Sequence, residues 1–227
     1  SEHDHPGANH LYIHLMEASA QPELAMPSAQ KLESLVPISG HMVHMPGHIY
    51  LRVGEYEKAI DINERSQLVD LQFAEIWGDT NFPNIGTYGL SHKAHAPHAL
   101  DFVRYANMLQ GNYAESAAAA QRGAASVGEA VEAINRGQKR VAHSWIVDKV
   151  FGKYDKLHSA QQSHSGTPYL DGMWSYVKGS AHVSKGHMEL AENELANIQA
   201  QMVADNVDDT GVGPTPASHV LTLASHA

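Results

Sequence analysis

The sequence predicts an all-α protein assembled from helical hairpins, and three observations indicate this fold class. Segments with helical composition and pattern cover most of the 227 residues. Several prolines and glycines fall at the ends of these segments, where such residues begin and end helices. A short turn motif recurs along the chain, and no segment has the pattern of a β-strand.

The chain is expected to form helices over most of its length. The predicted helices cover residues 9–17, 23–35, 41–53, 56–69, 97–110, 113–122, 128–150, 154–163, 171–185 and 188–204. Pro6 and Pro97 suit a first helical position, because the N–H that proline lacks has no helical partner there. Pro46 falls inside a predicted helix and is expected to kink it.

Two segments lack a helical pattern. Residues 70–95 contain several glycines and turn dipeptides, so they are expected to form an insertion or a long loop. The tail over residues 205–227 is expected to be largely irregular, with a last helical turn near 218–224. Residues 1–227 as a whole are expected to form a single helical domain.

The recurrent turn motif is a glycine, an aromatic residue or methionine two positions later, and a small or apolar residue three positions after that. Its copies begin at Gly54, Gly111, Gly152 and Gly186. This pattern resembles the tetratricopeptide repeat (TPR), a helix–turn–helix unit of about 34 residues. Counted from the glycines, the repeats begin at Pro6, Gly40, Pro97, Gln138 and Gly172. The resemblance implies a TPR-like α-solenoid of about five helical hairpins, whose first helices line a concave groove.

Histidine is unusually frequent, with 17 His against 15 Lys plus Arg. His41, His44 and His48 are expected on one helix face, because their spacings leave them within about 60° of one another at about 100° per residue. In tetratricopeptide repeats, particular positions of each first helix face the groove. The resemblance implies that the groove is lined by side chains of three successive units, namely His10, His14, Glu17, His41, His44, His48, His98 and Asp101.

These residue types predict a transition-metal site. Histidine is the commonest protein ligand of transition metals, and two histidines four residues apart on a helix can chelate one ion. We expect His10 and His14 to meet His44 and His48 at one ion. One turn away, His41 is expected to approach His98 and to extend the site or form a second one. Zinc is the default ion, and copper and non-haem iron stay open.

Other functions of the same groove are compatible with the sequence. Glu17 is a candidate ligand or general base, and equally an ordinary carboxylate at a helix end. Without a metal, a groove of protonatable imidazoles suits a protein-interaction scaffold that holds an acidic peptide or a small acid. The sequence does not separate a metal-dependent enzyme from a metal-handling protein. It contains no His-Glu-x-x-His run, phosphate loop or nucleophile elbow.

Composition excludes several classes of partner. The formal net charge of −10 leaves no basic surface for a nucleic acid. No apolar run approaches the roughly 18 residues of a membrane span. The chain has no cysteine, so neither disulfides nor thiolate ligands contribute. None of these properties indicates a cellular compartment.

Two segments make the family resemblance more specific. They are His5-Pro-Gly-Ala-Asn-His-Leu-Tyr-Ile-His14 and Gly40-His-Met-Val-His-Met-Pro-Gly-His-Ile-Tyr50. They are similar to signature segments of a group of bacterial TPR proteins. Members of that group carry further repeats upstream, so the resemblance implies that this chain is the C-terminal part of a longer protein. Where the group has a His-Asn-x-His segment in the next repeat, this chain has His98-Ala-Leu-Asp101. The resemblance implies a fold and a site, but no particular activity.

The remaining histidines are expected to have other roles. His92 and His95 fall in the predicted loop, either as part of a lid over the groove or as solvated side chains. Seven further histidines share no helix face and are expected to be structural or superficial: His143, His158, His164, His182, His187, His219 and His226.

Overall fold

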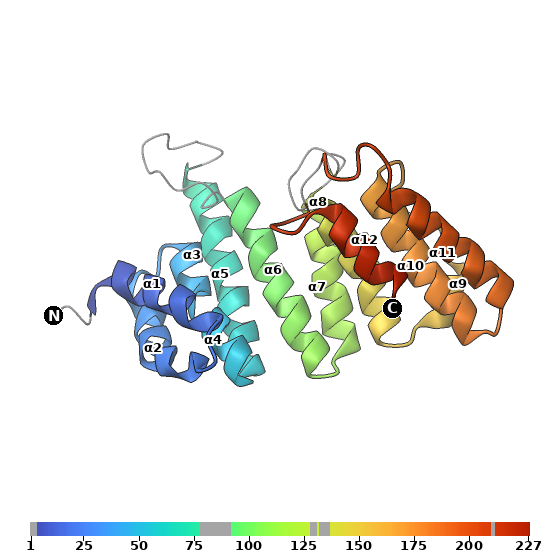
Figure 1. Ribbon diagram of the computed structural model, residues 1–227. Coiled ribbons are helices and arrows are strands. Elements are labelled where there is room, and N and C mark those ends of the chain that lie inside the picture. The colour runs from blue at the N-terminus through green and yellow to red at the C-terminus, as the bar shows by residue number, and fades with distance from the viewer. Residues whose placement is uncertain (1–3, 78–91, 128–130, 132–136, 210–211) are drawn as a thin grey trace. The chain divides into compact units, whose positions relative to one another are not determined.

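The computed structural model describes residues 4–77, 92–127, 131, 137–209 and 212–227 (Figure 1). The described chain is all-α, as predicted, and contains no strand. It divides into two compact units, Ser1–Ala119 and Ala120–Ala227. Each unit is treated separately below. No helix of the described segments is long and apolar enough to cross a membrane.

The N-terminal unit is built from short helices packed on two long ones. Its elements are α1 (Pro6–Glu17), the 3-10 helix η2 (Pro22–Ala25), α2 (Met26–Leu35), α3 (Gly40–His44), α4 (Pro46–Val53), α5 (Tyr56–Trp77), α6 (His92–Leu109) and the start of α7 (Tyr113–Ala125). The α1 helix packs against α2 and α4, and α5 packs against α3, α4 and α6. A core of apolar side chains that includes Ile13, Leu32, Ile49 and Tyr50 fills the space between them.

Local sequence signals begin and end these helices. Pro6 and Pro46 stand in the first turns of α1 and α4. Ser39 caps α3 by accepting a hydrogen bond from the backbone N–H of Met42. The predicted turn glycines all adopt positive φ angles, a backbone conformation that glycine alone adopts without steric cost. The φ angles are 85° at Gly54, 77° at Gly111, 63° at Gly152 and 75° at Gly186.

The predicted loop over residues 70–95 is wrong at both described ends. The α5 helix continues to Trp77 and α6 begins at His92, while residues 78–91 lie outside the described segments. Polar contacts explain the longer helices, since the Ser66 hydroxyl donates to the carbonyl of Gly40 and Asp70 pairs with His95. In the sequence, buried polar residues that pair with each other cannot be distinguished from exposed polar residues of a loop.

Prolines act differently at two sites. The chain between α3 and α4 is interrupted at Met45, directly before Pro46, as expected for a proline-induced kink. Pro97, by contrast, lies inside α6 and does not begin it.

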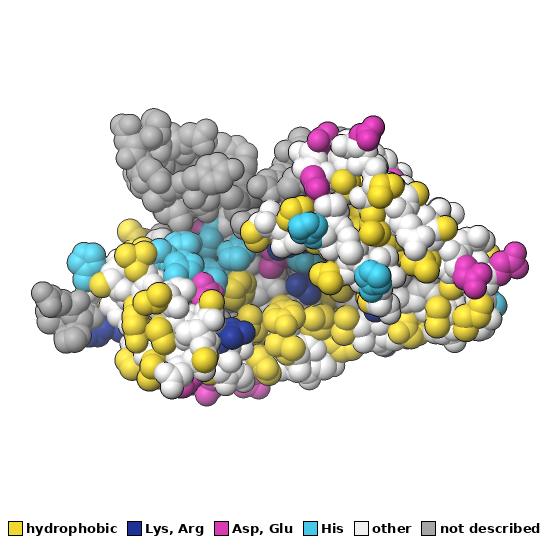
Figure 2. All heavy atoms as spheres, in the orientation of Figure 1, with side chains coloured by type: hydrophobic (Ala, Val, Ile, Leu, Met, Phe, Trp, Pro, Cys, Tyr) yellow, Lys and Arg dark blue, Asp and Glu magenta, His cyan; other side chains and the backbone are white. Residues whose placement is uncertain are grey.

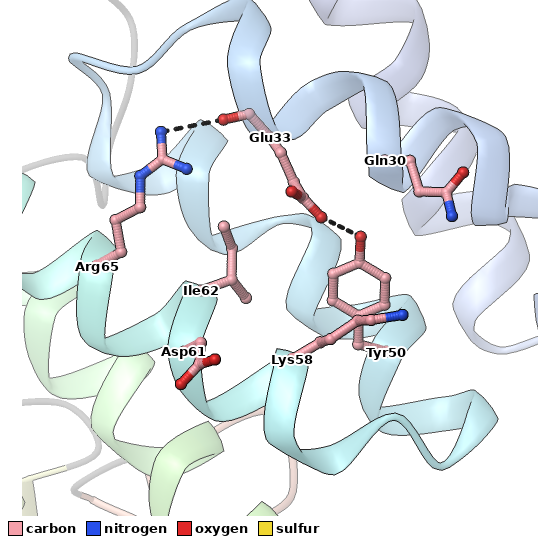
Figure 3. Close-up of a pocket in the computed structure, with 7 residues that line it drawn as sticks. All are labelled: Gln30, Glu33, Tyr50, Lys58, Asp61, Ile62 and Arg65. Carbon is pink, nitrogen blue, oxygen red and sulfur yellow. Dashed lines mark hydrogen bonds between the residues drawn. The ribbon is translucent and has the colours of Figure 1, made fainter.

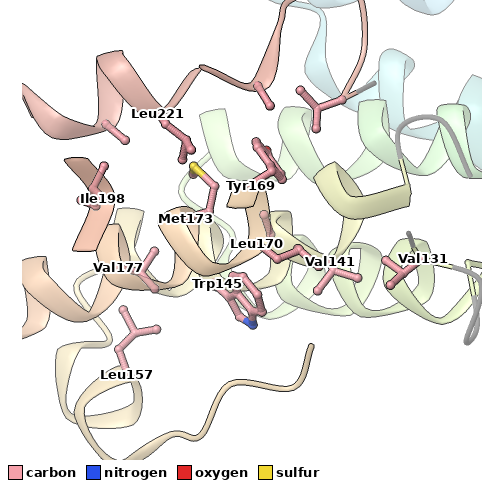
Figure 4. Close-up of a cluster of buried hydrophobic side chains, with 14 of the residues drawn as sticks. Val131, Val141, Trp145, Leu157, Tyr169, Leu170, Met173, Val177, Ile198 and Leu221 are labelled. Atoms are coloured by element: carbon pink, nitrogen blue, oxygen red, sulfur yellow. The ribbon is translucent and has the colours of Figure 1, made fainter. Parts of the chain in front are cut away.

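The C-terminal unit has a separate apolar core (Figure 4). Its elements are α8 (Gly137–Val150), α9 (Tyr154–Ser159), α10 (Pro168–Ser184), α11 (Met188–Met202) and α12 (Ala217–Ser225). Trp145, Leu170 and Leu221 are among the buried side chains between them. The α9 helix is shorter than predicted, and α12 accounts for the helical turn expected in the tail. Most of residues 128–136, predicted as helix, lie outside the described segments.

Candidate metal centre

Six of the predicted histidines gather on one face of the N-terminal unit, where imidazoles form a visible patch (Figure 2). They come from α1, from the α3–α4 segment and from α6. They form two groups of three, and within each group one ring nitrogen per residue lies within 4.8 Å of the others. The outer group is His10, His14 and His41, and the inner group is His44, His48 and His98.

This grouping differs from the expected pairing. His41 lies with His10 and His14, not with His98, and His98 lies with His44 and His48. The expected meeting of His14 and His48 across two helices does occur, with ring centroids 5.4 Å apart. The two groups are therefore neighbours, each with its own set of ligand atoms.

The outer group combines two rings of α1 with one of α3. His10 and His14 lie one helical turn apart with ring centroids 4.8 Å apart. The Nε2 atoms of His10 and His41 are 3.0 Å apart. His14 is exposed and the other two are partly buried, so this group is accessible to solvent.

The inner group is more buried. His44 is fully buried, and its Nε2 lies 2.8 Å from Nε2 of His48. The ring of His98 approaches that of His44 at a centroid distance of 4.8 Å. The phenyl ring of Phe102 packs at 4.7 Å from both His44 and His48 and shields the group.

Hydrogen bonds on the opposite ring nitrogen hold the inner imidazoles. Nδ1 of His44 lies 2.5 Å from Oδ1 of Asn63, whose amide nitrogen donates to the carbonyl of Ala59 at 2.7 Å. That second bond fixes the orientation of the Asn63 amide, so its oxygen faces His44. An amide oxygen only accepts, and Nδ1 of His44 therefore carries the hydrogen.

Glu17 binds two imidazoles with one carboxylate. Its Oε1 accepts from Nδ1 of His14 at 2.8 Å, and its Oε2 pairs closely with Nδ1 of His48. Burial on its own would raise the pKa of Glu17, but the hydrogen bonds and charges of His48 and His14 hold this pKa at about 2. The ionised carboxylate cannot donate, so both Nδ1 atoms carry the hydrogen.

These contacts turn the Nε2 atoms of His44 and His48 toward each other, 2.8 Å apart. Burial lowers the pKa of His44 well below its usual value, so its Nε2 carries a lone pair. In the metal-free protein this lone pair accepts a hydrogen bond from Nε2 of His48. A metal ion can take the place of that hydrogen, because both nitrogens then act as donors to the same cation.

His95 is a member of the cluster that the sequence did not reveal. Its Nδ1 lies 2.6 Å from Oδ2 of Asp70, with both side chains buried. Its Nε2 is buried and has no hydrogen-bond partner among the described residues. Its ring centroid is 5.4 Å from His41 and 5.2 Å from His44, so it stands between the two groups. A carboxylate behind an imidazole is a common arrangement behind metal ligands. The prediction of a loop at His95 concealed this role, and the side chain of His92 is not described.

Two glycines make room for these supporting residues. A Cβ atom on Gly40 would lie 2.0 Å from Oδ1 of Asp70, and one on Gly47 would lie 2.4 Å from Nδ2 of Asn63. Glycine at these positions lets α3 and α4 approach α5 closely enough for Asp70 and Asn63 to reach the histidines. The glycines of the Gly40–Tyr50 segment therefore serve the site as well as the packing.

Two imidazoles of the outer group, those of His10 and His41, have lowered pKa values that favour the neutral form at neutral pH. Burial first, then the neighbouring charges of His95 and His10, lower the pKa of His41 to about 3. Burial also lowers the pKa of His10, and His14 and His48 lower it further. Neutral imidazoles are the form that binds metal ions.

A separate hollow of about 460 Å³ lies between α2, α4 and α5 (Figure 3). Its lining is Gln30, Glu33, Tyr50, Lys58, Asp61, Ile62 and Arg65, with no histidine. The Tyr50 hydroxyl donates to the Glu33 carboxylate, and Arg65 donates to the Glu33 carbonyl at 3.1 Å. These bonds pair three of the polar residues of the hollow with one another, and no group of potential metal ligands is found there among the described residues, so the histidine cluster is the stronger candidate for a functional site.

Comparison with protein-family models, with curated proteins and with solved structures found no match to this chain. The histidine clusters could each hold a metal ion, and the assignment of a function depends on their chemistry alone.

Proposed function

We propose that this chain is a transition-metal-binding protein whose N-terminal unit holds a two-ion, histidine-lined centre. The ligands are His10, His14 and His41 for one ion and His44, His48 and His98 for the other. The carrying observation is that each group brings one ring nitrogen from each of three histidines within 4.8 Å of the others, on one face of the N-terminal unit.

The distances support ligation. Two nitrogens bound to one ion at about 2.0–2.1 Å lie about 2.8–3.4 Å apart for bond angles between about 90° and 109°. The Nε2 separations of 2.8 Å and 3.0 Å lie at the lower end of that range. Zinc is the default ion because it binds neutral imidazole well, and copper and non-haem iron accept the same donors. Three histidines leave one tetrahedral position open, as in catalytic zinc sites.

Glu17, Asp70 and Asn63 serve in this proposal as positioning residues. Each hydrogen-bonds the Nδ1 side of a histidine, so that Nε2 is the nitrogen presented to the ion. Glu17, a candidate ligand from the sequence, has both carboxylate oxygens engaged by histidines. His95 is a candidate additional ligand between the two groups, because its Nε2 has no partner among the described residues.

We further propose that the chain is a TPR-like solenoid and that the centre lies in its concave groove. The positive φ angles of the four turn glycines support the repeat. The meeting of α1, the α3–α4 segment and α6 at one cluster fits helices that occupy equivalent places in successive repeats.

A metal-free groove for acidic peptides is less well supported. It needs protonated imidazoles, whereas burial lowers the pKa values of His10, His41 and His44. The Glu17 carboxylate adds a negative charge that would repel an acidic ligand.

The test is elemental analysis of protein purified without a histidine tag or metal column, followed by zinc titration. We expect about two more zinc ions bound per chain in the wild type than in the double variant His14→Ala/His48→Ala, which removes one ligand from each group. Both proteins should have the same helical circular dichroism, because neither side chain belongs to the apolar core. Equal zinc binding by wild type and a folded double variant would overturn the proposal.

A further inference from the structure

A third histidine cluster lies in the C-terminal unit. It consists of His158, His182 and His187, with one nitrogen of each ring within 4.8 Å of the others. The ring centroids of His158 lie 5.3 Å from His182 and 5.7 Å from His187. Sequence spacing did not group these residues, because they belong to three different elements.

The α10–α11 turn holds two of the three. His182 lies in the last turn of α10, and His187 directly precedes α11. Gly186, at a φ of 75°, reverses the chain between them. The N–H of His187 donates to the carbonyl of His182 at 3.0 Å, and the N–H of Gly186 donates to Val183 at 3.0 Å. This closed turn is a Schellman-type helix end, which fixes the two rings on one side.

Lys178 holds the third histidine in place. Its ammonium group donates to the carbonyls of Leu157 at 3.1 Å, His158 at 2.7 Å and Ala160 at 3.4 Å. These bonds tie the end of α9 to α10. His158 lies in this last turn of α9, and its ring packs against the ring of His182.

His182 has a buried nitrogen that nothing described satisfies. The residue is only 8% exposed, and its Nδ1 has no hydrogen-bond partner in the described part of the chain. Leaving such an atom unpaired inside a protein costs free energy. His158 and His187 are exposed, so ions reach the cluster from solvent. Burial and the charges of His158 and Lys178 lower the pKa of His182, and the charge of Glu194 partly offsets them.

We propose that His158, His182 and His187 form a further binding site for a divalent transition-metal ion of the zinc class, with solvent completing the coordination. Three imidazoles, the donor set of known catalytic zinc sites, match this chemistry. The largely buried ring of His182 and the exposed rings of His158 and His187 each supply one nitrogen to this site. The site shares no residue with the N-terminal centre and does not depend on it.

The experiment uses the full chain carrying His14→Ala/His48→Ala, in which the N-terminal centre is disabled. Zinc binding is measured by equilibrium dialysis with elemental analysis, and helicity by circular dichroism. This background is expected to bind one zinc ion per chain, and His158→Ala/His187→Ala added to it should abolish that binding. Both of these side chains are exposed, so their loss should leave the fold intact.

The matched control is His219→Ala in the same background, which removes an exposed histidine of the same unit outside the cluster. It should keep the zinc ion. A background protein that binds no zinc, or equal losses from the control and from His158→Ala/His187→Ala, would overturn the site. Failure of the N-terminal proposal has a different signature, since the wild type would then bind no more zinc than the background.

Discussion

The N-terminal and C-terminal histidine clusters use the same side chain in different surroundings. In the first, His14, His44, His48 and His95 are hydrogen-bonded through Nδ1 to a carboxylate or an amide oxygen. In the second, the rings are placed by the backbone of a turn and by a lysine that ties α9 to α10. Imidazoles fixed in tautomer and orientation bind ions more tightly. We therefore expect the N-terminal centre to have the higher affinity.

The largest expected effect is the loss of a ligand from the inner group. His48→Ala removes a proposed ligand and also frees the Glu17 carboxylate that it binds. Loss of a residue that only supports a ligand typically lowers metal affinity about 10- to 100-fold. We therefore expect His48→Ala to lower zinc affinity at the inner group by more than about 100-fold. His187→Ala should lower affinity at the C-terminal cluster by only about 10-fold, the lower end of that range. Competition titration against a chelator measures both. Equal losses at the two clusters would contradict the comparison.

A smaller effect is expected from the carboxylate behind His95. Asp70→Asn keeps the shape of the side chain but weakens its bond to Nδ1 of His95, so zinc affinity should fall about 10- to 100-fold. Glu57→Gln, an exposed carboxylate change on the same helix, is the control and should leave affinity unchanged. Wild-type affinity in Asp70→Asn would remove His95 from the proposed ligands.

Glycine substitutions separate packing from metal binding. Gly40→Ala places a Cβ 2.0 Å from Asp70, and Gly172→Ala places one 2.5 Å from Leu221 in the other unit. Each should lower the free energy of unfolding by about 1–3 kcal/mol through overpacking. Only Gly40→Ala should also weaken zinc binding at the N-terminal centre, because only it displaces a supporting residue. Gly123→Ala in α7 meets nothing within 4 Å and should be neutral or slightly stabilising. Urea unfolding and zinc titration of the three variants test this.

The smallest effect concerns pH in the metal-free protein. The folded chain keeps His41 neutral down to a pKa of about 3, while the unfolded chain takes up the proton near pH 6.5. The unfolded state thus binds more protons between these values, and stability should fall as pH is lowered from about 6.5 to 3. Glu17, whose pKa is held at about 2 in the folded chain, adds a further loss of stability as the pH falls below its usual pKa of 4.5. His41→Gln should flatten the first part of the curve, measured by urea unfolding across pH. Increasing stability on acidification would contradict this.

Local signals in the sequence determined the helices and most of the cluster. Helical pattern, proline at helix starts and glycine at turns are consequences of backbone sterics, so they are readable residue by residue. The spacing of His10 with His14 and of His44 with His48 follows from helix periodicity alone. The resemblance to tetratricopeptide repeats implied that these pairs meet, and the ring centroids of His14 and His48 do lie 5.4 Å apart.

Tertiary structure alone decided how the histidines are grouped and supported. Whether His41 meets His10 or His98 depends on the relative displacement of packed helices, which side-chain volumes and glycine contacts set. Asp70, 25 residues from His95, and Asn63, 19 residues from His44, have no local relation to the rings that they hold. The cluster of His158, His182 and His187 likewise exists only because a closed turn and Lys178 bring three helix ends together. A sequence pattern encodes which face a side chain occupies on its own helix, whereas the partner across a helix interface is settled by packing of the whole unit.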